Sequence, residues 1–180
     1  MKKNLLSIVA ITALVALPIN LMAQTTVTSS AVHSSATIIQ PIKITSSGEL
    51  NFGVIASSSV AGTFVLNPDG TAGTATNVTP LSGVTQAEDL KVPNFVVNGE
   101  VDYTYAITLP ASNITLTSGT GETAKTMTVG TFKTSKANNE VIGTLTSGTD
   151  NFKVGATLAV GASQPSGVYT GTFTVTANYN

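Results

Sequence analysis

The chain lacks cysteine and tryptophan and has a single histidine. Without cysteine it forms no disulfide and carries no thiol nucleophile, and one histidine cannot complete a zinc site. That histidine, His33, lies in a Ser- and Thr-rich segment where no neighbouring residue suggests a catalytic triad. We therefore predict no metal site, no cofactor and no catalytic residue of these types, and we expect stability to come from sheet packing and hydrogen bonds.

Charge is also scarce, at 9% of the residues, and there is no arginine. Removal of Lys2 and Lys3 with a leader segment leaves six lysines against nine acids, a net charge of −3. Such a surface does not attract nucleic acid or anionic lipid. We predict that neither is a partner.

A few acids could still act in pairs, as two carboxylates do in glycoside hydrolysis. The candidates are Glu88 with Asp89, Glu100 with Asp102, and Glu122, all in expected loops or hairpin ends. Acids in exposed turns are usually solvated. We therefore predict that the chain is not an enzyme.

The first residues have the features of a secretory signal peptide. Lys2 and Lys3 are followed by an apolar run over residues 5–17, then by Pro18 and a small residue, Ala23. The apolar run is short for a membrane span, and no stop-transfer segment follows. We predict cleavage after residue 23 and export to the periplasm, the cell surface or the medium, with no membrane span after cleavage.

The remaining composition favours strands. Threonine, valine, isoleucine and the aromatic residues have high β-propensity, and 16 glycines and 7 prolines supply turns. We predict an all-β fold, an antiparallel β-sandwich with Greek-key connections, and keep a closed barrel as the alternative. Residues 1–23 are the signal peptide, 24–33 an N-terminal extension, and 34–180 a single sandwich domain.

The expected strands follow from apolar alternation between turn signals. Turns are expected at residues 67–70, at Asn98-Gly99, which is typical of a hairpin, and at residues 161–167, and a loop is expected at 81–89. The strands are expected at residues 34–45, 50–55, 62–66, 74–78, 94–97, 103–109, 114–117, 126–132, 141–146, 151–160 and 168–180.

The last of these has the clearest period of two in the chain. Its outward face is expected to carry Thr170, Thr172, Thr174, Thr176 and Asn178. Its buried face is expected to carry Tyr169, Gly171, Phe173, Val175, Ala177 and Tyr179.

Covalent strand locking by a Lys–Asn isopeptide bond would require a buried lysine. Four lysines occur in strand-like segments: Lys43, Lys125, Lys133 and Lys153. The sequence does not bring any of them together with an asparagine and an acid, and surface lysine is the usual case.

Several segments resemble a bacterial family known as domain of unknown function 4402. They are ITSSGELNFGVI, GTFVLNPDG, NFVVNG, YTYAITLP, NFKVGATLAVG and SGVYTGTFTVTANYN, which together cover nearly all of the chain after the leader. The two ends are also similar to those of chaperone-usher pilins and spore coat U-type secreted proteins. The chain departs from most pilins in having no early cysteine.

The resemblance implies an immunoglobulin-like, pilin-like fold in which subunits, either copies of this chain or related ones, assemble through β-strand pairing. It also implies a periplasmic chaperone as a partner. The implied donor strand lies in residues 24–33, with Val27 and Ala31 as its anchors. The implied assembly strand, which also binds the chaperone, carries Gly167, Tyr169, Phe173, Val175 and Tyr179.

Two functions remain open from the sequence. The first is a non-catalytic exported subunit, structural or surface-associated, of a Gram-negative bacterium. The alternative is a self-contained secreted sandwich that binds or adheres through its loops. In that case the last strand is paired within a complete sandwich and the extension is only a leader.

Overall fold

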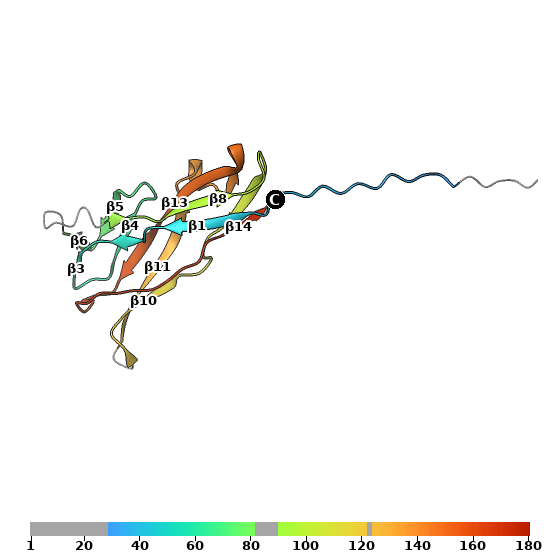
Figure 1. Cartoon of the computed structure of the whole chain (residues 1–180). Helices are drawn as coiled ribbons and strands as arrows, with labels where there is room; N and C mark the ends of the chain where they lie inside the picture. Colours follow the sequence, from blue (N-terminus) through green and yellow to red (C-terminus); the bar gives the residue numbers. More distant parts are fainter. Residues whose placement is uncertain (1–28, 82–89, 122–123) are drawn as a thin grey trace, which may run out of the picture. The chain divides into compact units, whose positions relative to one another are not determined.

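A computed structural model describes residues 29–81, 90–121 and 124–180. The chain divides into two compact units, Met1–Thr37 and Ile38–Asn180. In the first, the described residues 29–37 form no helix or strand and are exposed. The second is built from antiparallel sheets (Figure 1), which confirms the predicted all-β class. Within the described ranges no helix is long and apolar enough to cross a membrane.

The described strands are short except for two in the centre of the large sheet. Two 3₁₀ turns, η3 (Ala137–Asn139) and η4 (Thr146–Gly148), separate the later strands. The strands are β1 (Lys43–Ser47), β2 (Asn51–Phe52), β3 (Ile55–Ser57), β4 (Gly62–Leu66), β5 (Ala72–Thr76), β6 (Val78–Pro80), β7 (Leu90–Lys91), β8 (Asn94–Asn98), β9 (Thr104–Thr108), β10 (Ile114–Ser118), β11 (Lys125–Thr134), β12 (Ile142–Thr144), β13 (Thr149–Val160) and β14 (Thr176–Tyr179).

The large sheet is organised around β13, which lies between β8 and β11 (Figure 1). One edge of β13 pairs first with β8, over residues 149–153, and then with β4, over residues 156–160. Gly155 lies where the partner changes, and a Cβ at this position would be 2.3 Å from the carbonyl oxygen of Leu66. Only glycine leaves room for two strands to meet on one edge of β13.

A three-stranded sheet, β12-β9-β14, covers one half of the large sheet. The core between them includes Tyr105, Val97 and Leu145, whose side chains have no exposed surface. Phe95 and Phe152 stack in the same core, with their ring centroids 5.3 Å apart. This first core is closed by ordinary sheet-on-sheet packing.

The other half of β13 contributes to a second core, which includes Phe64, Leu66, Ala156 and Leu158. The three-stranded sheet contributes no residue to this core. Two short strand pairs cover it instead, β2 with β7 and β3 with β6. Half of the sandwich therefore lacks a full second layer.

Several expected elements are confirmed. The predicted strand at residues 62–66 is β4, and the turn at 67–70 closes with a 2.9 Å hydrogen bond from Gly70 N–H to the Asn67 carbonyl. The predicted inward face of residues 151–160 is buried throughout. Its members are Phe152, Val154, Ala156, Leu158 and Val160.

Two expectations about individual strands are wrong. The strand predicted at residues 34–45 begins only at Lys43, after Pro41, which has no N–H to donate to a ladder. Asn98-Gly99 does not form a hairpin, because β8 pairs in the large sheet and β9 in the small one. Neither residue has the positive φ that a tight hairpin turn requires.

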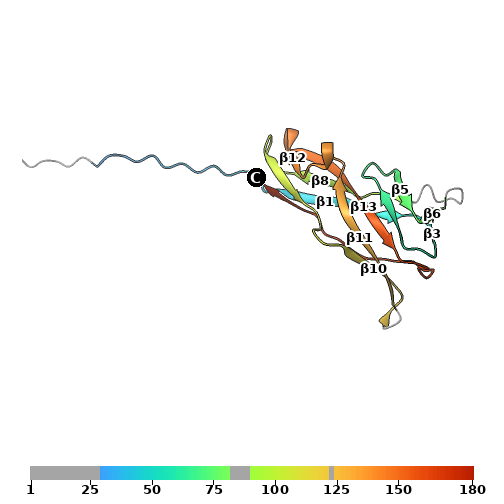
Figure 2. The same cartoon turned by 180° about the vertical axis from the view of Figure 1, so that it is seen from behind.

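The predicted strand at residues 168–180 is wrong in length and right in orientation. Only Thr176–Tyr179 forms a strand, and Thr170 makes a single isolated bridge to Thr117. Figure 2 shows the C-terminal segment, in dark red, passing β10 before β14 begins. The outward threonines are exposed as expected, and Val175 is buried on the opposite face.

An ion pair inside the fold joins Asp150 of β13 to Lys136, with Nζ–Oδ distances of 2.5 and 2.6 Å. Tyr105, from the small sheet, donates a 3.0 Å hydrogen bond to the same carboxylate. Burial of the hydroxyl, and then the charge of Asp150, raise the pKa of Tyr105 well above its ordinary value. The lysines considered for an isopeptide bond, Lys43, Lys125, Lys133 and Lys153, are all exposed.

Replacement of Tyr105 with Phe should therefore change how stability depends on pH. Above about pH 10 an unfolded tyrosine loses its proton while folded Tyr105 keeps its own, so the folded state loses stability as the pH rises. The variant should show a weaker decline between pH 9 and 11 in urea unfolding. Tyr103→Phe is the control, and an equal decline in wild type and Tyr105→Phe would contradict the assignment.

Candidate functional site

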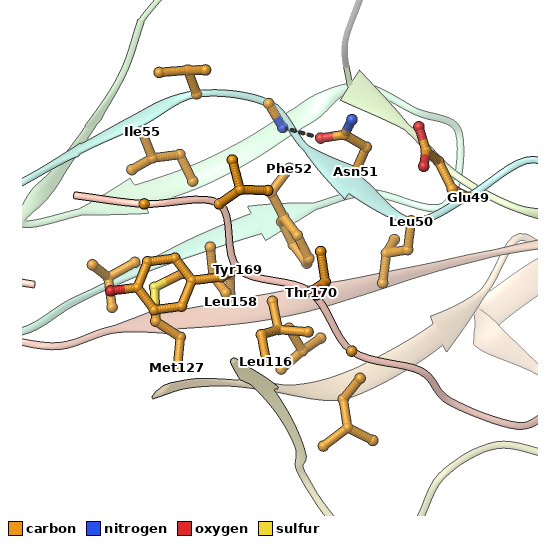
Figure 3. A pocket seen from close by; sticks show the side chains of 18 of the residues that line it. Glu49, Leu50, Asn51, Phe52, Ile55, Leu116, Met127, Leu158, Tyr169 and Thr170 are labelled. Atoms are coloured by element: carbon orange, nitrogen blue, oxygen red, sulfur yellow. Dashed lines mark hydrogen bonds between the residues drawn. The ribbon is translucent and has the colours of Figure 1, made fainter. Parts of the chain in front are cut away.

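An apolar groove with a volume of about 1000 Å³ opens over the second core. Residues 48–57, with β2 and β3, form one side, which we call the N-terminal wall. Residues 164–173 form the other side, the C-terminal wall. Figure 3 shows Phe52 and Ile55 from one wall, Tyr169 and Thr170 from the other, and Leu158 from the sheet beneath.

The floor of the groove comes from adjacent strands of the large sheet. Leu116 of β10, Met127 of β11 and Leu158 of β13 all face into it. Among the described lining residues, Glu49 is the only one that carries a charge. The groove therefore has an apolar floor between walls that carry a single charged residue, so it has almost no electrostatic preference.

The C-terminal wall has one paired and one unpaired edge. Thr170 exchanges backbone hydrogen bonds of 2.8 and 3.0 Å with Thr117 of β10. In an extended chain the backbone groups of the flanking residues, Tyr169 and Gly171, point to the opposite edge. No backbone hydrogen bond joins Tyr169 or Gly171 to another described residue. This edge is free to pair with a further strand.

Gly171 explains why the C-terminal wall lies so close to β10. A Cβ at this position would be 2.6 Å from the Thr115 carbonyl oxygen and 2.8 Å from Leu116 Cδ2. Any larger residue would push the wall away from β10.

The two walls are joined at one end of the groove. Ser57 donates a 3.1 Å hydrogen bond from its hydroxyl to the Gln164 carbonyl, and Ser163 N–H donates a 2.6 Å bond to the Ser58 carbonyl. The Gln164 amide in turn donates to the Tyr169 hydroxyl at 2.8 Å. The end of the N-terminal wall therefore meets the start of the C-terminal wall, so the walls run in opposite directions.

A second junction, which we call the Tyr179 clamp, joins the last strand to the residues that precede β1. The Tyr179 hydroxyl donates a 2.7 Å hydrogen bond to the Gln40 carbonyl and accepts one of 2.6 Å from Glu100 N–H. The Glu100 carboxylate accepts a 2.7 Å bond from Gln40 N–H. The clamp fixes the point at which the chain enters the sandwich domain.

The structure distributes the predicted assembly-strand residues over three environments. Gly167, Tyr169 and Phe173 line the groove, Val175 is buried in the first core, and Tyr179 belongs to the clamp. Sequence reasoning missed the floor residues, because Leu116 and Met127 look like ordinary inward-facing strand residues. The signal for the N-terminal wall is the LNFGVI segment, which predicts a strand and does not indicate a groove.

The other candidates from the sequence do not form a site. Of the donor residues, Ala31 is exposed and Val27 lies outside the described residues. Glu88, Asp89 and Glu122 also lie outside them.

Among the described acids, Glu100 belongs to the clamp and Asp102 is exposed, as is His33. The described ranges contain no group of three or more metal-ligating side chains.

A smaller polar hollow lies between the turn at residues 67–69 and residues 134–139. Hydrogen bonds from the hydroxyl and backbone N–H of Thr71 hold the pKa of the exposed Asp69 below its ordinary value. These bonds stabilise the turn, and they explain the lowered pKa of Asp69 without a bound ligand.

The family model for domain of unknown function 4402 matches residues 42–179. The chain belongs to this family. The match covers the sandwich domain from the residue before β1 to the end of β14, and it confirms the resemblance to this one family. No curated protein matches the chain.

The contribution of the Tyr179 clamp to stability can be tested directly. Tyr179→Phe removes one acceptor and one donor and leaves Glu100 N–H without its partner, which should lower the free energy of unfolding by about 1–3 kcal/mol. Tyr103→Phe is the matched control, because its ring contacts that of Tyr179 but its hydroxyl bonds to no described residue. Equal urea midpoints for the two variants would contradict the role of the clamp.

Proposed function

We propose that this protein is a non-catalytic exported subunit whose groove accepts a β-strand from another chain. The observation that supports this most is an apolar groove bounded by a wall with an unpaired backbone edge. An added strand would gain main-chain hydrogen bonds from that edge and bury alternate side chains in the groove.

The sequence pattern of the C-terminal wall supports the proposal. Residues 168–175 alternate as a strand does, yet only Thr170 is paired. A strand pattern without a strand partner is expected where the partner comes from another molecule. An incoming strand would make residues 168–179 one continuous strand.

The chemistry of the groove indicates what kind of strand fits. Because the walls run in opposite directions, an inserted strand is parallel to one and antiparallel to the other. Its inward residues must be apolar or small, since burial of an unpaired charge against Leu116 and Met127 would be costly. An uncharged strand that places an apolar or small residue at every second position therefore fits the groove.

The remaining parts of the proposal come from the sequence. A signal peptide over residues 1–23 would place the chain outside the cytoplasm, where an apolar groove needs protection before assembly. A periplasmic chaperone that fills the groove temporarily is the partner implied by the likeness to pilins. A self-contained binding module is less favoured, because such a module requires a complete sandwich.

The proposal can be tested with a short synthetic peptide that alternates valine with threonine. At a concentration one hundred times its Kd, a peptide bound only to the folded chain stabilises it by about 2.7 kcal/mol. Thermal unfolding of wild-type monomers isolated by size exclusion should therefore shift upward. Leu116→Asp should abolish the shift, because the charge would lie on the groove floor.

Thr115→Asp is the control, since Thr115 is exposed on the same strand. It should respond to the peptide as wild type does. The proposal fails if the isolated wild-type monomer does not respond, or if Leu116→Asp responds equally while remaining folded in urea titrations.

A further inference from the structure

We infer that the strand accepted by the groove is supplied by residues 32–38 of a second copy of this chain. The inference rests on the proposed function and names its partner. It follows from three properties of this segment: its alternation, its lack of charge and its distance along the chain from the Tyr179 clamp.

The alternation places the larger apolar side chains on one face. In an extended conformation Val32, Ser34, Ala36 and Ile38 point to the same side. Val32 is 89% exposed and Ile38 is 96% exposed in the structure. Burial of an isoleucine and a valine that are left almost fully in water would stabilise a complex between two copies.

The segment also matches the groove in polarity and shape. Residues 29–40 contain no acid or lysine, and the described groove lining contains only Glu49 as a charged residue. Threonine, valine and isoleucine favour the extended conformation that pairing requires. Residues 29–37 are assigned no strand, so no existing sheet pairing would have to be broken.

Position along the chain separates this segment from the donor expected earlier. Residues 24–33 offer only Val27 and Ala31 as anchors, and alanine buries little surface. Only Ile39 separates residues 32–38 from Gln40, which the clamp holds. A donor in this position would join consecutive subunits through Ile39 alone and would fix their relative orientation.

Two matched variants of the chain without residues 1–23 test the inference by complementation. A donor variant, Val32→Asp with Ile38→Asp, keeps its groove, and an acceptor variant, Leu116→Asp, keeps its donor. Light scattering after size exclusion should show polymers for wild type, monomers for each variant alone, and one-to-one dimers for their mixture. Thr37→Asp, on the outward face of the donor, should polymerise as wild type does.

A peptide of residues 29–40 provides a second measurement that does not depend on unaided polymerisation. It should raise the thermal midpoint of the donor variant, and the same peptide with both aspartates should not.

The outcomes separate the inference from the proposed function. If the donor variant still polymerises, or responds to the valine-threonine peptide but not to residues 29–40, the groove takes another strand and the inference is wrong. If the acceptor variant, folded in urea titrations, responds to both peptides, the proposed function itself fails. A wild-type monomer whose residues 32–38 are protected from hydrogen exchange would show that the segment fills its own groove, which also overturns the inference.

Discussion

The structure depends on β13 contributing to two cores while the second sheet covers only one of them. Phe152 and Val154 face the first core, and Ala156 and Leu158 face the second. Burial of apolar side chains is the main source of folding free energy, so the partly exposed Leu116 and Met127 beside the second core are surface that another chain can bury. Gly155 makes the arrangement sterically feasible by allowing β8 and β4 to share one edge.

Hydrogen bonds rather than disulfides join the walls, because the chain has no cysteine. Ser57 bonds to Gln164 at one end of the groove, and outside the groove the Tyr179 clamp joins the last strand to the residues before β1. The walls are therefore positioned before any strand is inserted. A positioned groove reduces the conformational entropy that an incoming strand must offset.

Local patterns predicted the elements that are paired within the chain. The alternation of residues 151–160 and the turn at residues 67–70 depend on short-range rules, and the structure confirms both. Where the strand predicted at residues 168–180 begins could not be derived in this way, because pairing depends on which edge lies beside it. The alternation in residues 168–180 is typical of a strand. Within the described part of this chain, however, only Thr170 and residues 176–179 have a pairing partner.

The groove floor could not be predicted for a related reason. Leu116 and Met127 alternate as core residues do, and nothing in the sequence shows that the sheet above them ends early. Asn98-Gly99 is a second example, because its hairpin signal is overridden by the crossing from β8 to β9 between the sheets. Sequence patterns show which face of a strand is apolar, but they do not show whether another layer of the fold covers that face.

The most direct measurement is amide hydrogen exchange of the C-terminal wall, followed by NMR in the isolated monomer and with a strand bound. The account predicts that Thr170 is protected in both states, because it already pairs with Thr117. Tyr169 and Gly171 should exchange rapidly in the monomer and become protected when the groove is filled. Slow exchange of Tyr169 and Gly171 in the isolated monomer would show that their edge is already paired, and would contradict the central claim.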